Sequence, residues 1–253
     1  MIKKEQTNKE YHLDPSISAS GIKTIFLKSV FHHLNKAFKK TPAMVLGSAV
    51  HSYFLEPENF KKEFFVMPKL DLRTKIGKET KVNIELENKG KDLITEEDFS
   101  IIKGIEKNYN KNESALYYSK GEVEVSHFIT YKGIPLKARP DCFNIENNFI
   151  SDIKTCQDNS PKSFRYDVYK WGYHLQAVVY SEVMGIPVEN FRFIAIETKY
   201  PYSVQLYSLN EKMIEEGRFG FQKALSDWRL YLETGIVMGY NTDNLNNDGS
   251  IIL

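Results

Sequence analysis

Two stretches decide the fold: Arg139-Pro140-Asp141 and Ser151-Asp152-Ile153-Lys154-Thr155. Residues 133–139 have the pattern of a strand that leads into the first stretch, and Asn147-Asn148 is a turn signal before the second. Side chains alternate along a strand, so Asp152 and Lys154 share one face and Ile153 points to the other. If the two strands pair as a hairpin around the turn, Asp141 lies beside Asp152, and Lys154 stands next to both acids.

Two carboxylates and an amine in one place suit the hydrolysis of a phosphodiester bond. Carboxylate oxygens select Mg²⁺ or Mn²⁺, and such an ion neutralises the scissile phosphate and activates a bound water. Lys154 would orient or help deprotonate that water and offset the charge that grows in the transition state. An Asp-x-Lys pair is also common on the solvated face of a strand. The pair alone leaves both interpretations open.

The pattern resembles the PD-(D/E)xK nuclease superfamily, with Pro140-Asp141 as its first element and Asp152-Ile153-Lys154 as its second. More narrowly, the chain resembles the RecE-type exonuclease (exonuclease VIII) nuclease domain of bacteria and their phages. Four further segments carry this resemblance in the right order: Ile17-Ser18-Ala19-Ser20, Leu46-Gly47-Ser48-Ala49-Val50-His51, Arg73-Thr74-Lys75-Ile76-Gly77-Lys78-Glu79 and Tyr173-His174-Leu175-Gln176. It implies an α/β fold with a PD-(D/E)xK nuclease core, in which helices flank a central mixed β-sheet, and a phage or prophage origin.

The resemblance also implies roles for residues outside the hairpin. His51 would join Asp141 and Asp152 at the metal as a neutral imidazole, although a lone His on an apolar helix face is commonly structural. Tyr173 and Gln176 share a helix face, and the resemblance places them beside the scissile phosphate or the metal's water shell. Glu124 is our candidate for a further acid at the metal. Glu122 shares its strand parity, so the choice between the two stays open.

Positive charge in residues 68–91 predicts contacts with the DNA backbone. The predicted DNA contacts are Arg73, Thr74, Lys75, Lys78 and Arg139. The whole chain has a net charge of only +1, but phosphate contacts need local positive charge rather than a high overall charge. Residues 68–91 lack apolar periodicity, so we expect a long, mobile loop. Solvated loop charges would give the same pattern.

Length and composition indicate one domain. A chain of 253 residues with 42% hydrophobic content can bury one sizeable core. We place the nuclease domain at residues 17–238, after an N-terminal extension (residues 1–16) and before a loose Asn/Asp-rich tail (residues 239–253). The sequence shows no signal peptide and no membrane span, so we expect a protein of the bacterial cytoplasm with no membrane partner.

Hydrophobic periodicity and cap residues predict the remaining elements. We expect helices over about 18–37, 42–55, 95–108, 172–184 and 210–232, and one that begins at Ser160-Pro161. We expect strands over about 64–66, 122–130, 190–197 and 203–207. Strand order cannot be read from periodicity, so the central sheet is an expectation from the resemblance.

The resemblance implies a Mg²⁺-dependent exonuclease, with Mn²⁺ as a possible substitute, that degrades one strand of linear double-stranded DNA from its 5′ end. The 3′ single strand that remains would serve a RecT-type annealing recombinase. Processivity in this family comes from a ring-shaped homo-oligomer, and we favour a tetramer over a trimer. Two alternatives remain: a structure-specific or restriction-type endonuclease with the same site, and a DNA-binding module whose metal chemistry is silent.

Overall fold

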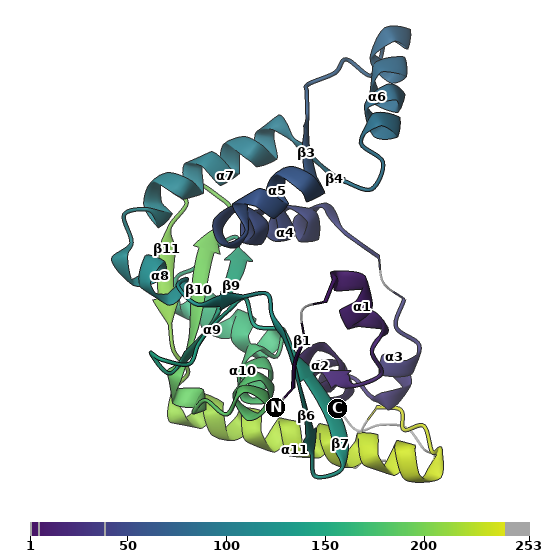
Figure 1. The fold of residues 1–253 in the computed structure, drawn as a ribbon, viewed down its shortest axis with the longest axis vertical. Coiled ribbons are helices and arrows are strands. Elements are labelled where there is room, and N and C mark those ends of the chain that lie inside the picture. Colours follow the sequence, from purple (N-terminus) through teal and green to yellow (C-terminus); the bar gives the residue numbers. More distant parts are fainter. Residues whose placement is uncertain (1, 5, 38, 241–253) are drawn as a thin grey trace.

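The computed structural model describes residues 2–4, 6–37 and 39–240, so all but the first two residues of the expected C-terminal tail (239–253) lie outside the described residues. A five-stranded sheet lies at the centre, in the order β11-β10-β9-β8-β5 (Figure 1). Its strands are β5 (Glu122–Val123), β8 (Cys142–Asn144), β9 (Phe149–Cys156), β10 (Phe191–Glu197) and β11 (Val204–Tyr207). β9 and β10 are parallel, whereas the other pairs are antiparallel. The expected mixed sheet is therefore confirmed.

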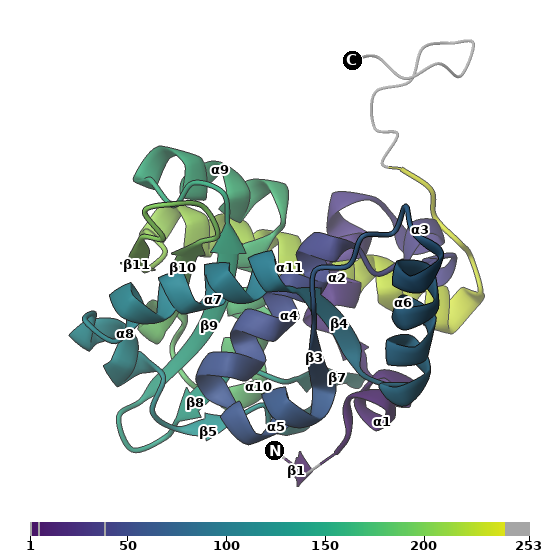
Figure 2. The same cartoon turned by 90° about the horizontal axis from the view of Figure 1, so that it is seen from above.

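Helices cover both faces of this sheet (Figures 1 and 2). On one side lies α10 (Tyr173–Met184), with α2 (Ala19–Leu27) and α11 (Glu211–Thr234) packed against it, and the other side carries α4 (Pro42–Leu55) and α7 (Glu96–Tyr109). β10 shows how the sequence separates the two cores. Phe191, Phe193 and Ala195 belong to one core, and Ile194 and Ile196 belong to the other. The run of apolar residues from Phe193 to Ile196 is therefore buried on both sides of the sheet.

A four-stranded sheet, in the order β1-β6-β7-β2, stands beside the central one. Its strands are β1 (Ile2–Lys4), β6 (Ser126–Tyr131), β7 (Ile134–Ala138) and β2 (Ile17–Ser18). The predicted strand over 122–130 is wrong as a single element, because Glu124 adopts a positive φ of 53° and divides it between the two sheets. The predicted hairpin is also wrong in one of its two strands. Within residues 133–139, Ile134–Ala138 form β7 of the second sheet, and β8 is the strand that pairs with β9.

Most of the predicted boundaries of helices and strands are confirmed within two residues. The helices not yet described are short. These helices are α1 (Asn8–Leu13), α3 (Val30–Leu34), α5 (Pro57–Glu63), α8 (Glu113–Tyr118), α9 (Pro161–Lys170) and the 3₁₀ helix η1 (Val188–Asn190). The single helix predicted over 18–37 is divided into α2 and α3, because Ser29 is extended and its hydroxyl accepts the N–H of His32 as a new N-cap. None of the helices in the described part of the chain has the length and apolar character to span a membrane.

A helix, α6 (Lys75–Glu87), replaces most of the loop predicted over 68–91. The Thr74 hydroxyl accepts the N–H of Gly77 at 3.0 Å as an N-cap, and Lys75 and Glu79 pair at 3.7 Å one turn apart. These polar interactions stabilise a helix without apolar periodicity, which explains the wrong prediction. β3 (Phe64–Met67) and β4 (Asp92–Thr95) pair in parallel at its base, and α6 stands out from the body as an arm (Figure 1).

Candidate active site

The β8–β9 hairpin brings the two predicted acids together. The strands are antiparallel with Cys142 opposite Ser151, so Asp141, just before β8, lies beside Asp152 of β9. Asp141 Oδ2 accepts the N–H of Ile153 at 2.6 Å. Both acids are buried, with exposed fractions of 8% for Asp141 and 1% for Asp152. The structure therefore has the juxtaposition that the sequence predicted.

A histidine and a third acid surround Asp141. His51 Nδ1, on α4, lies 3.0 Å from Asp141 Oδ2. Ligand atoms of His51, Glu124 and Asp141 all lie within 4.8 Å of one another, and we call these three residues the ligand group. Glu122 instead pairs with Lys3 at 2.9 Å. Of the two acids that the sequence left open, Glu124 is the one at this site.

Asp152 is held by a lysine and an amide rather than by the ligand group. Lys154 Nζ contacts both of its carboxylate oxygens, and Gln176 Nε2 donates to them at 3.1 and 2.9 Å. Within the described residues, Asp152 does not join the set of mutually close ligand atoms. The role of Asp152 as a metal ligand stays a prediction. In that role, one of its carboxylate oxygens would contact both the metal ion and either Lys154 or Gln176.

Helix α10 presents two predicted residues to these charges. Tyr173 and Gln176 are three positions apart and so lie on one face of the helix, which is the face toward β9. Gln176 reaches Asp152, and Lys154 Nζ lies 4.8 Å from the centre of the Tyr173 ring, close enough for a cation–π contact. The structure thus gathers all the predicted catalytic side chains in one place, and their roles stay predictions.

Burial and mutual charge shift the protonation of the ligand group. Burial and then the charge of Asp141 raise the pKa of Glu124 to about 8. Burial lowers the pKa of His51, but the Asp141 carboxylate outweighs burial and raises that pKa to about 9. His51 is therefore an imidazolium at neutral pH when no cation is bound. The neutral imidazole that we expected forms only when its proton is displaced.

The surrounding carboxylates favour the charged form of Lys154. Burial lowers its pKa, but the charges of Asp152 and Asp141 outweigh burial and raise the pKa above its usual value. An ammonium group has no lone pair to accept a proton. In this charged state Lys154 can orient a water or stabilise negative charge, and its part in deprotonating the water stays a prediction.

The ligand group fits a divalent cation. Two carboxylates and one imidazole converge within 4.8 Å, and hard carboxylate oxygens suit Mg²⁺ and Mn²⁺. The imidazole is a softer donor and favours Mn²⁺ over Mg²⁺. The donor types and their spacing therefore meet the first requirement of a metal site.

A cavity of ≈ 410 Å³ adjoins the ligand group. Its wall includes Ser48, Ser52 and Glu56 from α4 and its end, together with residues 6–8 of the N-terminal segment. Neither set was predicted to belong to the site. A signal for the first set is present in the sequence, since polar residues recur every four positions at Ser48, Ser52 and Glu56. They form a polar stripe beside His51 on a largely apolar helix, and this stripe could have revealed them. Residues 6–8 carry no such local signal, because only the fold brings them here.

Arg139 has a different role from the predicted DNA contact. Its Nη1 donates to Asn8 Oδ1 and its Nη2 to the carbonyl of Gln6, each at 2.9 Å. Its Nε donates to Ser126 Oγ at 2.9 Å, and the guanidinium lies 4.5 Å from the centre of the Tyr11 ring. A buried guanidinium whose donors are bound within the protein has little capacity left for phosphate. Arg139 fixes the N-terminal segment instead.

The other predicted DNA contacts lie on the arm. Arg73 is exposed over 92% of its side chain and pairs with Asp71 at 3.0 Å. Lys75 and Lys78 are exposed on α6, whereas the Thr74 hydroxyl forms the helix cap. The structure places none of these residues in the ligand group, and their contact with DNA stays a prediction.

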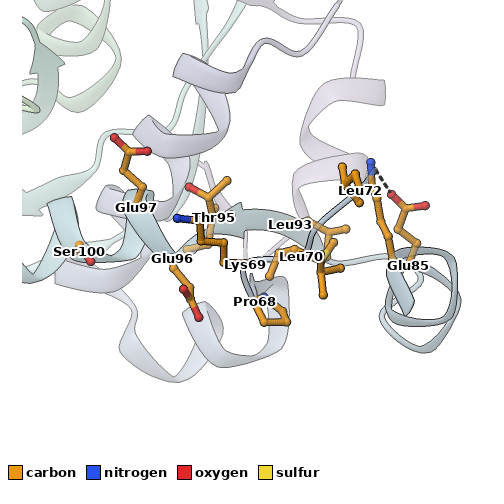
Figure 3. A pocket seen from close by; sticks show the side chains of 13 residues that line it. Pro68, Lys69, Leu70, Leu72, Glu85, Leu93, Thr95, Glu96, Glu97 and Ser100 are labelled. Carbon is orange, nitrogen blue, oxygen red and sulfur yellow. Dashed lines mark ion pairs between the residues drawn. The ribbon is translucent and has the colours of Figure 1, made fainter. Parts of the chain in front are cut away.

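A second hollow, of ≈ 660 Å³, lies at the base of the arm (Figure 3). Its lining includes Pro68, Leu70, Leu72 and Leu93, and none of its residues belongs to the ligand group. It is the larger of the two spaces, but it lacks the converging acids and imidazole that hydrolysis requires. The smaller cavity, which adjoins the ligand group, is therefore the candidate active site.

Comparison with known proteins supports a nuclease fold. Residues 18–234 match the family described as "PDDEXK-like domain of unknown function (DUF3799)". The crystal structure of a "Putative exonuclease" from Eubacterium rectale has a TM-score of 0.65 and 18% sequence identity, and the match covers 99% of this chain and 95% of that chain. The crystal structure of SSO0001 matches 74% of this chain and 88% of its own at 14% identity, and its TM-score of 0.30 is too low to support an argument. No curated protein matches this chain.

We expect the affinity for Mn²⁺ to rise steeply between pH 6.5 and 8.5. A cation must displace protons from Glu124, whose pKa is about 8, and from His51, whose pKa is about 9. Below these pKa values, a fall of one pH unit therefore lowers the binding constant for Mn²⁺ about tenfold for each proton that must be displaced. Calorimetric titration in buffers of different ionisation enthalpy measures both the affinity and the protons released. Glu124→Gln should weaken binding and flatten the pH dependence, whereas the matched control Glu122→Gln should change neither. A pH-independent affinity would contradict this prediction.

Proposed function

The chain belongs to the family of PDDEXK-like domains (DUF3799), and from this premise we propose that it is a metal-dependent exodeoxyribonuclease. It degrades one strand of linear double-stranded DNA in the 5′ to 3′ direction and leaves a 3′ single strand for recombination. The convergence of Asp141, Asp152 and Lys154 beside His51 is the observation that carries the hydrolytic part of this proposal. The polarity, the duplex substrate and a RecT-type annealing recombinase as partner rest on the resemblance to RecE-type exonucleases.

The ligand group would hold Mg²⁺, with Mn²⁺ as a substitute. When bound, such an ion supplies Lewis-acid activation of the phosphate and of a water. Lys154 places a fixed positive charge beside the reacting phosphate, where negative charge grows in the transition state. Gln176 orients Asp152 by donating to both of its oxygens, and Asp152 in turn fixes Lys154. The Tyr173 ring limits where the ammonium can move.

The arm supplies the proposed grip on the DNA backbone. Arg73, Thr74, Lys75 and Lys78 gather where the arm enters α6, and backbone contacts of this kind give affinity without sequence preference. Large apolar side chains are also exposed along α6, including Ile76 at 76% near its start and Leu86 at 67% near its end. Exposed apolar surface of this kind is typical of contact with another macromolecule.

In the nuclease assay we expect the protein with Mg²⁺ or Mn²⁺ to release label from the 5′ end of a linear duplex and to leave a closed circle intact. Asp141→Asn and Lys154→Met should each slow release at least about 100-fold, because each removes a charge that the transition state needs. The matched control Glu122→Gln changes an acid outside the ligand group and should retain full activity. End-labelled duplexes resolved on denaturing gels measure the rate, the polarity and the product.

Each alternative has its own result in this assay. Cleavage of the closed circle would show an endonuclease that uses the same site. Binding of DNA with no hydrolysis under either metal ion would show a silent binding module. A product without 3′ single strands would remove the reason to expect an annealing recombinase as partner.

We expect Arg73→Ala to weaken DNA binding and to reduce the slope of log affinity against log salt by about 0.9, the value for one phosphate contact on duplex DNA. The affinity for Mn²⁺ should not change, because the arm is separate from the ligand group. Fluorescence anisotropy at several salt concentrations measures the slope. An unchanged slope would remove Arg73 from the DNA interface. Lys212→Ala, a surface cation of α11 that is 78% exposed, is the control.

The ring-shaped assembly is also part of the proposal, with a tetramer favoured over a trimer. A closed ring around the duplex would keep the enzyme on its substrate between cycles. We expect sedimentation equilibrium to give a mass about four times that of the 29.4 kDa chain. A monomer at all concentrations would refute the ring, and a mass three times that of the chain would establish the trimer.

A further inference from the structure

We propose that Lys23 binds a phosphate group of the nucleic-acid substrate beside the reacting centre. Lys23 belongs to α2, and its Nζ lies 5.6 Å from the centre of the Tyr173 ring. Lys154 Nζ lies 4.8 Å from the same ring, so two ammonium groups adjoin one aromatic side chain next to Asp152. This inference rests on the proposed function, because it states how the same site holds its substrate.

Lys23 has no carboxylate in contact with it, although the charge of Asp152 acts on it from a greater distance. Over residues 2–4, 6–37 and 39–240, no carboxylate lies within the ion-pair distance of 4.0 Å from its Nζ. Asp152, whose charge acts on Lys23, is already held by Lys154 and Gln176. An ammonium group that contacts an aromatic ring but no carboxylate, placed beside the reacting centre, is available to an anionic ligand.

The electrostatics of Lys23 agree with this geometry. Burial and then the positive charge of Lys154 lower the pKa of Lys23 to about 8. A bound anion would oppose both effects, because it stabilises the charged form of a lysine. The cationic state of Lys23 is thus less stable in the protein alone than it would be beside a phosphate.

Packing fixes the position of the side chain. Gly172, with a φ of 64°, forms the turn before α10. A methyl group at Gly172 would lie only 3.2 Å from Cγ and Cδ of Lys23, so the aliphatic stem of Lys23 occupies the space that the missing side chain leaves. A stem packed in this way holds the ammonium group in place. Lys23 therefore differs from a mobile surface lysine, which loses more entropy when it binds.

The chemistry of the group indicates the class of ligand. An ammonium group is a point charge that binds phosphate oxygens without reading the bases. That phosphate is either a phosphodiester within the strand or a terminal phosphate monoester, since both present the same oxygens. An internal phosphodiester and a terminal phosphate differ in where the nucleic-acid strand ends relative to α2. Oligonucleotides with and without a terminal phosphate therefore distinguish them.

The test measures binding of a labelled oligonucleotide by fluorescence anisotropy in EDTA, so that no hydrolysis occurs. Lys23→Met keeps the apolar stem over Gly172 and removes the charge, and it should weaken binding several-fold and lower the salt slope by about 0.7 to 0.9. Lys23→Arg should restore the slope, because it restores the positive charge. Lys212→Met removes an exposed cation of α11 and should leave the slope unchanged. Thermal unfolding of each variant verifies that it is folded.

Oligonucleotides with a 5′-phosphate or a 5′-hydroxyl distinguish the two sources of phosphate. An equal loss of slope on both assigns Lys23 to an internal phosphodiester, and a loss confined to the 5′-phosphorylated strand assigns it to the terminal group. An unchanged slope in folded Lys23→Met, or an equally low slope in Lys23→Arg, would overturn the proposal. Failure of the proposed function is a separate result, because it appears as absence of hydrolysis by the wild-type protein with Mg²⁺ and Mn²⁺.

Discussion

The buried carboxylate of Asp141 connects the parts of the molecule that form the site. Its Oδ2 accepts the N–H of Ile153 in β9 and lies 3.0 Å from His51 Nδ1 in α4. Glu124 approaches it from the point where the chain passes between the two sheets. A buried charge costs several kcal/mol unless partners compensate it. The sheet, α4 and the strand crossing must therefore meet at this carboxylate.

The crossing that delivers Asp141 is itself anchored by two buried cations. Lys137 Nζ donates to the carbonyls of Tyr11 and Asp14 at 2.6 and 2.7 Å, and Arg139 binds residues 6–8. The Tyr11 ring lies against both cations, 4.7 Å and 4.5 Å from its centre. These contacts fix the end of β7, where the chain leaves one sheet to enter the other. The N-terminal segment thus positions Asp141, although it lies outside the stretch that matches the family.

The sequence could predict the features that depend on local patterns. Alternation in β9, the turn at Asn147-Asn148 and the spacing of Tyr173 and Gln176 each have a signal within one element, and the structure has all of them. It could not predict features that depend on distant segments. The positive φ of Glu124 and the acceptors of Arg139 arise only when two sheets and the N-terminal segment come together. The arm was missed for a different reason, since capping and ion pairs stabilise α6 without the apolar period that identifies most helices.

The site keeps its net charge when protons are exchanged for a divalent cation. With Glu124 and His51 protonated, the anions Asp141 and Asp152 are balanced by His51 and Lys154. With a divalent cation in the ligand group, both protons leave, and three carboxylates are balanced by the cation and Lys154. Because uncompensated charge is costly in a buried environment, a site with these five residues accommodates either state without a net change in charge. Burial and the charge of Asp141 raise the pKa of Glu124, and the same carboxylate raises the pKa of His51, so these two residues would give up the protons that a divalent cation displaces.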